Sequence, residues 1–387
     1  MKVTVKKQAA KKIKKGYPLI QTEDLKKSVT SNHWVTFVDE TDQFLARGYL
    51  GKQNKGIGWV LTANDEPIDE AFFQKQFRTA KEKRRVYYQE EQTTAFRIVN
   101  GPGDHLGGLT IDLYENFAVF SWYNETLFGK KAEIIAAFQK IFPEVAGAYE
   151  KYRFGTGEVS NQLYGKKAPE PLLIKENNVS YAVYLDEGLM TGIFLDQKEV
   201  RGKLTQGLAT GKKVLNMFSY TGAFSVAAAM GGATETTSVD LAKRSRLKTE
   251  EQFSINGLSS DQQKIYVMDT FAYFNYAKKK NLTFDLVILD PPSFARNKKK
   301  VFSVAKDYGS LIENSVDILS EKGMILASTN AENLSVTKFR QTIETSLINK
   351  GVSFECVQSF RLPSDYTVSK AYPEGNYLKV FLYQIEK

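Results

Sequence analysis

The chain has 387 residues, which is enough for two or three packed domains. Hydrophobic residues make up 42% and charged residues 25%, which excludes a disordered chain, and no apolar stretch is long enough to span a membrane. Two histidines and one cysteine exclude an internal disulfide framework and leave too few ligands for a structural zinc site. The N-terminus alternates apolar and cationic residues, unlike a signal peptide, so we expect a cytoplasmic protein without a metal.

Basic residues outnumber acidic ones, with 53 Lys and Arg against 44 Asp and Glu. The excess lies in four short runs, at residues 6–15, 81–85, 278–280 and 298–300. The runs have two interpretations: solvated lysines that keep the protein in solution, or contacts to a polyanion, since neutralised phosphates supply much of the affinity for nucleic acid. Net charge alone does not decide between them.

The first region of the chain, about residues 1–72, contains three runs typical of short strands, at 34–38, 44–50 and 57–61. Glycines and polar residues separate these runs, as in a small β-barrel.

The second region, about residues 73–187, opens with a basic helical stretch through Phe77, Lys81 and Arg85. A hairpin is predicted further on, because two strand-like runs, 109–114 and 117–122, are separated by only two residues. We expect a small α+β domain here.

The third region, about residues 188–387, alternates strand-like runs with longer helical segments. Successive strand candidates are 214–218, 236–240, 264–269, 286–290 and 324–328. This alternation predicts an α/β fold with a parallel, doubly wound sheet, whose ligands bind at the carboxyl ends of the strands.

The first of these strands runs into a turn that ends at Gly222 and opens a helix of small residues, 226–229. Glycine lets the backbone approach a ligand closely, and the N-terminus of the helix offers unpaired N–H groups. A plain strand-to-helix connection is the alternative interpretation of this turn.

Acidic residues end the next two strands. Asp240 lies about 20 residues after the glycine turn, the spacing at which an acid binds ribose hydroxyls in nucleoside-cofactor folds. Asp269 could accept from an adenine amino group, with Phe271 beside the ring. Both acids could cap helices, Asp240 one that begins at Leu241 and Asp269 one that runs through Phe271 to Lys278, and for Asp240 the two roles can coexist.

The fourth strand ends in the sequence Asp290-Pro291-Pro292-Ser293-Phe294. Two prolines fix the backbone and remove two N–H donors directly after an apolar strand, so we expect a rigid platform that projects Asp290 and a carbonyl group into a cleft. A purely structural turn is the alternative.

At this point the chain resembles the RlmI-like class I S-adenosylmethionine (SAM)-dependent methyltransferases of large-subunit (23S) ribosomal RNA. The resemblance covers the whole chain and also includes segments 192–201 and 372–379. It implies a PUA-like N-terminal barrel (1–72), a central α+β domain (73–187) and a Rossmann-like catalytic domain (188–387) with a mixed, mostly parallel seven-stranded sheet.

The same resemblance implies SAM as cofactor and S-adenosylhomocysteine (SAH) as its product. The residues it places around SAM are Phe194, Asp196, Gln197, Arg201, Asn216, Met217, Phe218, Tyr220, Thr221, Gly222, Asp240, Asp269, Thr270, Phe271 and Asp290. It also implies that the barrel and the basic runs hold ribosomal RNA. A homodimer is compatible with the resemblance, and the sequence itself does not give the oligomeric state.

The target base is inferred from a departure from this family. Relatives that methylate cytosine C5 use a cysteine after the fifth strand, because C6 must first be attacked covalently. Here that place reads Ser328-Thr329-Asn330, and the lone Cys356 lies on a strand-like run where a buried structural thiol is expected. This segment looks more like that of relatives that act at guanine N7, whose lone pair is already nucleophilic, so the resemblance implies methylation of guanine N7, with cytosine C5 as the alternative.

Catalysis at N7 requires positioning of the base. The side chain of Asp290, the carbonyl of Pro291 and the side chain of Asn330 are the candidate catalytic groups, and Phe294 and Tyr308 are candidate stacking surfaces. A dehydrogenase, a small-molecule methyltransferase and a noncatalytic RNA-binding protein are the competing readings. SAM binding and RNA-dependent methyl transfer distinguish them.

Overall fold

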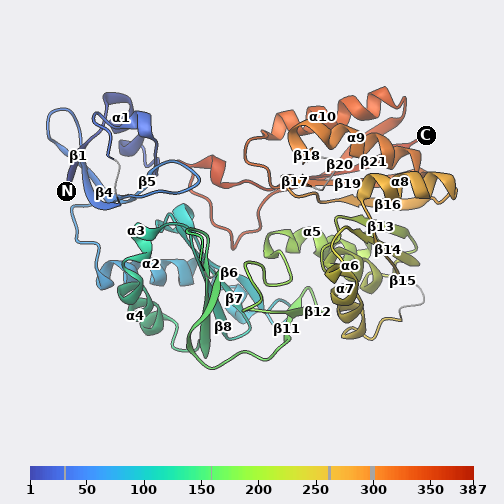
Figure 1. The fold of residues 1–387 in the computed structure, drawn as a ribbon, viewed down its shortest axis with the longest axis horizontal. Coiled ribbons are helices and arrows are strands. Elements are labelled where there is room, and N and C mark those ends of the chain that lie inside the picture. The colour runs from blue at the N-terminus through green and yellow to red at the C-terminus, as the bar shows by residue number, and fades with distance from the viewer. Residues whose placement is uncertain (30–31, 158, 260–262, 297–300) are drawn as a thin grey trace. The chain divides into compact units, whose positions relative to one another are not determined.

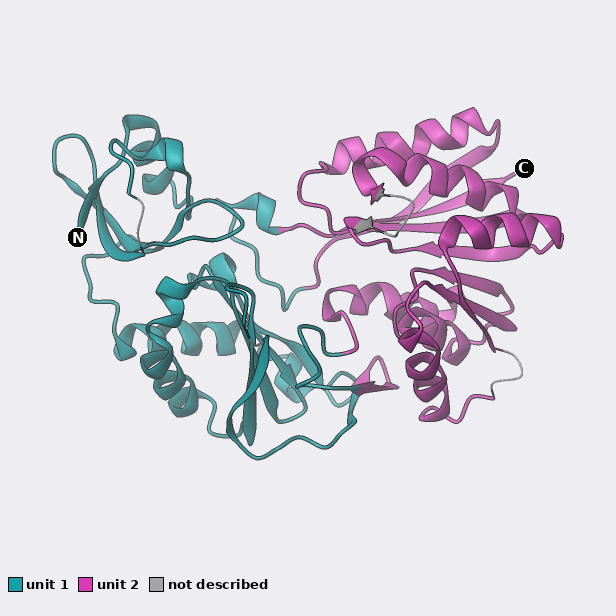
Figure 2. Cartoon of the chain, in the orientation of Figure 1, with its two compact units in different colours: residues 1–174, 183–191, 364–375 teal, residues 175–182, 192–363, 376–387 magenta. Residues whose placement is uncertain are grey.

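The computed structural model describes residues 1–29, 32–157, 159–259, 263–296 and 301–387. The chain forms two compact units that interleave along the sequence (Figure 2). Unit 1 comprises Met1–Ile174, Val183–Thr191 and Ser364–Gly375, and unit 2 comprises Lys175–Ala182, Gly192–Pro363 and Asn376–Lys387. The division at residues 72 and 187 stays a prediction. In the part of the chain that is described, no helix has the length and apolar character needed to cross a membrane.

The first sheet of unit 1 has five strands in the order β1-β3-β4-β5-β2. Its elements are β1 (Lys2–Thr4), α1 (Lys7–Lys14), β2 (Leu19–Ile20), β3 (His33–Val38), β4 (Phe44–Leu50) and β5 (Gly58–Thr62). The sheet buries alternate apolar side chains such as Val35 and Phe37 together with Ile13 of α1. The three predicted strands of this region are therefore confirmed, each to within one residue.

The second sheet of unit 1 also has five strands, in the order β10-β9-β8-β7-β6. They are β6 (Ala95–Asn100), β7 (Leu109–Tyr114), β8 (Phe117–Trp122), β9 (Gly147–Tyr152) and β10 (Ser160–Gly165), with helices α2 (Glu70–Lys83), α3 (Glu125–Phe128) and α4 (Lys131–Ile141). Phe77 of α2 and Phe138 of α4 join the apolar core of this sheet. The predicted hairpin is confirmed, because β7 and β8 pair antiparallel up to Tyr114 and Phe117.

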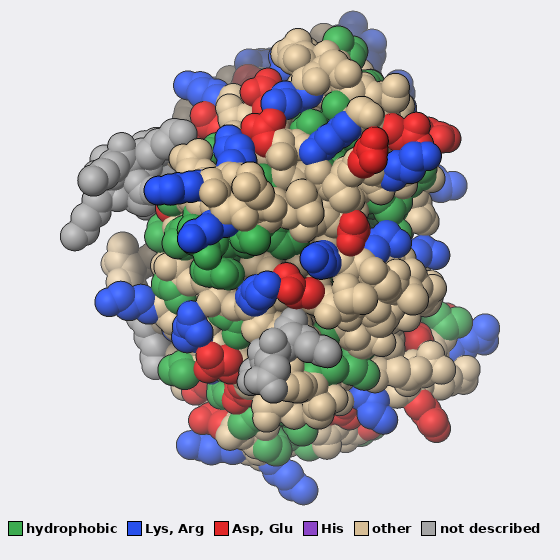
Figure 3. Space-filling model, turned by 90° about the vertical axis from the view of Figure 1, so that its right-hand side faces the viewer, with side chains coloured by type: hydrophobic (Ala, Val, Ile, Leu, Met, Phe, Trp, Pro, Cys, Tyr) green, Lys and Arg blue, Asp and Glu red, His purple; other side chains and the backbone are tan. Residues whose placement is uncertain are grey.

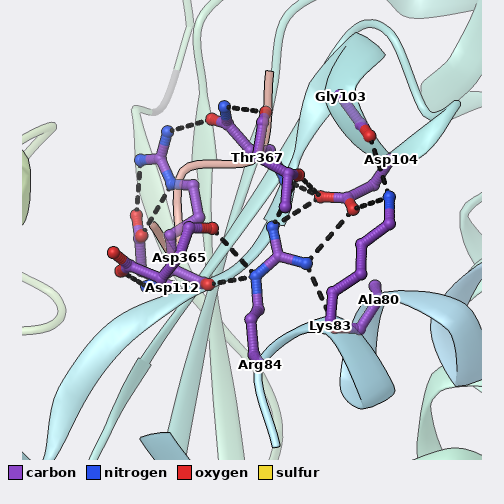
Figure 4. Close-up of polar contacts among 10 residues, drawn as sticks. Ala80, Lys83, Arg84, Gly103, Asp104, Asp112, Asp365 and Thr367 are labelled. Carbon is purple, nitrogen blue, oxygen red and sulfur yellow. Dashed lines mark hydrogen bonds and ion pairs between the residues drawn. The ribbon is translucent and has the colours of Figure 1, made fainter. Parts of the chain in front are cut away.

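A buried arginine fastens a distant segment of the chain to unit 1. Arg84 follows α2 and forms an ion pair with Asp104 at 2.6 Å, with side-chain exposures of 0% and 1% (Figure 4). Its guanidinium also donates to the carbonyl of Asp365 at 2.9 Å and to the hydroxyl of Thr367 at 3.0 Å. Segment 364–375 is thereby held by polar contacts from more than 260 positions away in sequence.

Unit 2 is built on a seven-stranded sheet in the order β15-β14-β13-β16-β19-β21-β20. The strands are β13 (Lys213–Met217), β14 (Glu235–Asp240), β15 (Gln263–Val267), β16 (Phe284–Leu289), β19 (Leu319–Thr329), β20 (Ser353–Phe360) and β21 (Lys379–Glu386). The first five pair in parallel, and β21 runs antiparallel to both of its neighbours. The predicted mixed, mostly parallel sheet is confirmed.

Helices cover both faces of this sheet (Figure 1). One layer contains α8 (Thr270–Lys279), α9 (Val304–Asp317) and α10 (Val336–Asn349), and the other contains α5 (Lys198–Lys203), α6 (Ala223–Met230) and α7 (Arg244–Ser254). Strand β16 shows why both faces are apolar: Val287 and Leu289 pack with the first layer, and Leu286 and Ile288 pack on the opposite face. Two short ribbons, β11–β12 (Leu172–Glu176 and Val179–Val183) and β17–β18 (Phe294–Arg296 and Val301–Ser303), complete the fold.

Candidate functional site

The site lies where the strand order of unit 2 reverses. The chain passes from β13 outward to β14 and β15 and then returns across β13 to β16 and β19. In such sheets the carboxyl ends of the two strands at the reversal leave a crevice in which ligands bind. Here those ends lead into the 218–222 turn and into Asp290.

The turn after β13 has an unusual backbone. Phe218, Tyr220 and Gly222 have φ angles of 58°, 52° and 79°, so left-handed residues alternate with ordinary ones. A side chain at such an angle costs about 1 to 3 kcal/mol, and strained backbone of this kind clusters at ligand sites. At Gly222 an added Cβ would also lie 2.5 Å from the Thr249 side chain, so only glycine fits.

Asp240 holds this turn in place. Its Oδ2 accepts from the backbone N–H of Tyr220 at 2.9 Å, and its Oδ1 accepts from the N–H of Ala242 at 2.8 Å. The helix expected to begin at Leu241 begins instead at Arg244, with Lys243 as its N-cap residue. The helix-cap interpretation of Asp240 is therefore wrong, because its carboxylate bridges the ends of β13 and β14.

A buried network of polar side chains lies next to the turn. The side-chain nitrogen of Asn216 donates to Ser225 at 3.0 Å, and Ser225 shares a hydrogen bond of 2.7 Å with Ser238. Asn216 is 1% exposed, and its Oδ1 has no hydrogen-bond partner among the described residues. Met217 packs in the apolar core, so only its backbone can line a ligand.

At the end of β15, Asp269 caps helix α8. Its Oδ1 accepts from the N–H groups of Phe271 at 3.0 Å and Ala272 at 3.2 Å, which confirms the helix-cap interpretation and leaves a cofactor role open. Thr270 is buried. The Phe271 ring packs with Phe302, which also contacts Phe218.

Asp290 is linked to the 194–197 segment. The side-chain nitrogen of Gln197 donates to Asp290 Oδ1 at 3.1 Å and to the hydroxyl of Ser328, at the end of β19, at 2.7 Å. These two acceptors fix the orientation of the amide, so its Oε1 faces the other way. Gln197 is 3% exposed, and Oε1 has no partner among the described residues.

The pKa of Asp290 is raised to about 6, chiefly because burial disfavours its charged form. The hydroxyl of Ser328 opposes this rise, the carboxylate of Asp196 adds to it, and the amide of Gln197 and the charge of Arg201 also lower the pKa. Asp196 itself accepts a hydrogen bond of 2.8 Å from the Tyr377 hydroxyl. The site thus holds two neighbouring carboxyl groups in different environments.

Arg201 supports the site from within the protein. Its guanidinium forms a bidentate ion pair with Glu176 at 2.6 and 2.7 Å and donates to the Phe194 carbonyl at 2.7 Å. The side chain is 2% exposed. Arg201 thus supports Phe194, whose exposed ring lies 5.5 Å from that of Tyr220, and the expected contact of Arg201 with the cofactor stays a prediction. Thr221 likewise donates to the Gly192 carbonyl at 2.6 Å.

The platform after β16 is close to Asn330. Pro291 is buried, and the Ser293 hydroxyl donates to the Asn330 side-chain oxygen at 2.7 Å. Phe294 is 62% exposed, and its expected stacking role stays a prediction. The stacking role expected for Tyr308 is wrong: its ring is fully buried, and its hydroxyl donates to the carbonyls of Leu289 and Ser328.

Cys356 lies in the middle of β20, the edge strand of the sheet, rather than at a carboxyl end. Its thiol is half-buried, not fully buried as expected, and contacts the Gln358 carbonyl at 3.7 Å. Burial raises the pKa of the Cys356 thiol, which disfavours the thiolate.

The basic runs have different environments. In run 81–85, Lys81 pairs with Glu144, and both Lys83 and Arg84 pair with Asp104. Most of the charges in that run are therefore paired with acidic residues of unit 1. Run 298–300 lies outside the described residues. On the face drawn in Figure 3, lysine and arginine side chains are interspersed with acidic ones. Among the residues that are described, no cluster of His, Cys, Asp and Glu could hold a metal ion.

Two functional residues had no role assigned from the sequence. Tyr377, which touches Asp196, belongs to the 372–379 motif, so a signal for it existed. Glu176, the partner of Arg201, lies on the short ribbon β11 and carried no sequence signal.

Comparison with known proteins identifies the family. The S-adenosylmethionine-dependent methyltransferase family matches residues 150–365, and the PUA-like domain family matches residues 3–63. The chain belongs to the SAM-dependent methyltransferases. This confirms the family resemblance, the PUA-like N-terminal region and SAM as the cofactor.

Relatives agree over nearly the full length. YwbD of Bacillus subtilis, provisionally named a ribosomal RNA large subunit methyltransferase, is 48% identical over 99% of each chain. Ribosomal RNA large subunit methyltransferase I of Klebsiella pneumoniae is 30% identical over 91% of this chain and 89% of its own. Among solved structures, a provisionally named methyltransferase complexed with SAH has 48% identity and a TM-score of 0.95, with 99% of this chain and 100% of that chain covered. A second, a provisionally named SAM-dependent methyltransferase from Streptococcus mutans, has 46% identity and a TM-score of 0.93 over the same shares of the two chains.

Proposed function

We propose that this chain transfers the methyl group of SAM to a base of large-subunit (23S) ribosomal RNA. The observation that carries the proposal is the pairing of two features at the strand reversal: a turn held by Asp240 and a proline-fixed platform bearing Asp290. The relatives named for large-subunit ribosomal RNA support the substrate class. The PUA-like region and the basic residues would contact the RNA in the cytoplasm. A homodimer remains compatible with this proposal.

The residues present fit SAM. Its ammonium, ribose hydroxyls and adenine amine are hydrogen-bond donors, and this site offers acceptors: the carboxylates of Asp240 and Asp269 and the Oε1 of Gln197, which no described residue contacts by a hydrogen bond. We assign the ribose to Asp240, the adenine to Asp269 and Phe271, and close backbone approach to Gly222. The Phe194 and Tyr220 rings flank the same edge of the sheet. When bound, SAM supplies a methyl group on a positively charged sulfur.

The residues that would orient the base are Asp290, the Pro291 carbonyl and Asn330. Phe294, with its exposed ring, would stack on the base. We favour guanine N7 as the acceptor atom, because a lone pair that is already nucleophilic needs positioning rather than a covalent enzyme group. The alternative is cytosine C5, which would require Cys356 to attack C6 from the middle of an edge strand.

The test has a binding step and a transfer step. Calorimetry should show SAH binding that is weakened about 5- to 150-fold by Asp240→Ala or Asp269→Ala, as expected for a lost ligand hydrogen bond of about 1 to 3 kcal/mol. Labelled SAM should then transfer its methyl group to protein-free large-subunit RNA or to ribosomal subunits, with RNA affinity that falls as salt rises. Unchanged SAH affinity in both variants would refute the cofactor site, and salt-independent RNA affinity would argue for a small-molecule substrate.

A further inference from the structure

Lys379 is a buried lysine at the same edge of the sheet as the site. It opens strand β21, opposite Thr329 at the end of β19, and is 3% exposed. Its ammonium donates to two backbone carbonyls, that of Ala331 at 3.0 Å and that of Tyr377 at 2.6 Å. Burial lowers the pKa of Lys379 to about 8, so the position is costly for a cation.

The two carbonyls belong to the two loops that reach the site. Ala331 directly follows Asn330, whose side-chain oxygen accepts from Ser293 on the proline platform. Tyr377 extends its hydroxyl to the carboxylate of Asp196 at 2.8 Å. One ammonium group therefore fixes the backbone behind a residue on each side of the site.

Arg361 reinforces one of these loops. Its guanidinium donates to the carbonyls of Leu378, at 2.6 Å, and of Asn376. Together with the contact from Lys379 to Tyr377, three consecutive carbonyls accept hydrogen bonds from cationic side chains. This arrangement immobilises the backbone that carries the Tyr377 ring.

We propose that Lys379 is a positioning residue that sets the 330–331 backbone and the 376–378 backbone in one geometry, so that Asn330 and Tyr377 are placed together for methyl transfer. The inference rests on the proposed function, in which Asn330 orients the base, and on the family resemblance, which places Asp196 beside the cofactor. Lys379 acts through these two residues and touches neither ligand. An apolar side chain at this position could pack against the end of the sheet, but it would supply no donor to either carbonyl.

The test compares Lys379→Met, which keeps most of the side-chain volume and removes the donors, with Lys387→Met. Lys387 follows the other end of β21 and also donates to a carbonyl of β19, that of Leu319, so although it is exposed it controls for the loss of a lysine-to-carbonyl bond on the same pair of strands. We expect Lys379→Met to lower kcat for methyl transfer to ribosomal RNA about 10- to 100-fold, and Lys387→Met to change it less than about twofold.

The decisive arm repeats Lys379→Met in an Asn330→Ala/Tyr377→Phe background. If Lys379 acts through these residues, its loss should there cost less than about threefold in kcat. An equal loss in both backgrounds, or a loss no larger than that of Lys387→Met, would overturn the inference. If Lys379→Met does not fold, Lys379→Gln, which keeps one donor, carries the same comparison with a smaller loss. An inactive wild-type enzyme would instead refute the proposed function.

Discussion

The side-chain nitrogen of Gln197 donates to the carboxylate of Asp290 at 3.1 Å, across 93 positions of sequence. This contact joins the segment before α5 to the proline platform after β16. The Asp290 carboxyl is partly shielded from water, and this desolvation raises the pKa of that group to about 6. Both the stability and the activity of the protein should therefore depend on pH.

Asp290→Asn should stabilise the protein at neutral pH while it damages activity. Since the folded state binds the proton of Asp290 more tightly than the unfolded state, the wild type loses stability as pH rises from about 4 through about 6. The variant lacks this penalty, on the order of 3 kcal/mol above pH 7. Urea unfolding of both proteins at several pH values checks this. A stability difference that is the same at pH 4 and pH 7.5 would contradict it.

Activity should show the same titration. An ionised Asp290 accepts hydrogen bonds from a base amine, so methyl transfer by the wild type should fall as pH drops through about 6. The pH dependence of kcat measures this. The control is a check that the wild-type protein stays folded over the same pH range. A flat profile between pH 5 and pH 8 would show that the charge of Asp290 is not used.

Gly222→Ala should weaken both folding and cofactor binding. Gly211 is a matched control, because it also has a positive φ, of 72°, but no atom of the described residues lies within 4 Å of an added Cβ. Both alanines bear the cost of left-handed backbone, and only the one at residue 222 also meets Thr249 at 2.5 Å. We expect Gly222→Ala to lower the free energy of unfolding by about 1 to 3 kcal/mol more than Gly211→Ala. Calorimetry with SAH should show weaker binding for the first variant alone.

Arg84→Met should severely destabilise unit 1. Removal of one partner leaves the carboxylate of Asp104 buried without its main counter-charge, at a cost of about 3 to 5 kcal/mol. The neighbouring Arg85 is exposed and lies 3.7 Å from Glu82, so Arg85→Met should change stability by less than about 0.5 kcal/mol. Denaturant unfolding distinguishes the two variants. Equal stabilities would mean that the contacts in Figure 4 do not hold segment 364–375.

Cys356→Ser should retain methyl transfer. The thiol lies in the middle of an edge strand, and its pKa is raised by burial, so it is a poor nucleophile. Turnover of this variant should stay within about threefold of the wild type, whereas Asn330→Ala should lose about tenfold or more. Complete loss of activity in Cys356→Ser, with a trapped adduct on 5-fluorocytosine-containing RNA, would restore cytosine C5 as the target.

The repeating parts of the fold could be predicted because their signals are local. Strand β16 is apolar on both faces and is followed by two prolines, which indicates a buried parallel strand and a functional turn from a few residues. The cap by Asp269 was also predictable, since a helix follows it directly. The acidic strand ends could be placed at one edge of the sheet by topology alone.

The rest depended on contacts between distant residues. The bond from Asp240 to Tyr220 joins two strand ends, and the pair of Glu176 with Arg201 joins a ribbon to a helix, and neither has a local pattern. Tyr308 is different: with Leu311, Ile312 and Ser315 it shares the buried face of α9, so its helical spacing could have indicated a core position. The attachment of segment 364–375 to unit 1 requires Arg84, which the sequence presents as part of a basic run that is either solvated or in contact with a polyanion.

We propose that this methyltransferase modifies a base of large-subunit ribosomal RNA without a covalent enzyme intermediate. Mass spectrometry of nucleosides from 23S ribosomal RNA, purified from cells with and without the gene, tests it most directly. We predict that one methylated nucleoside, 7-methylguanosine, falls on deletion and returns with the wild-type gene and with Cys356→Ser but not with Asp290→Ala. An unchanged nucleoside profile, or loss of 5-methylcytidine in its place, would contradict this account.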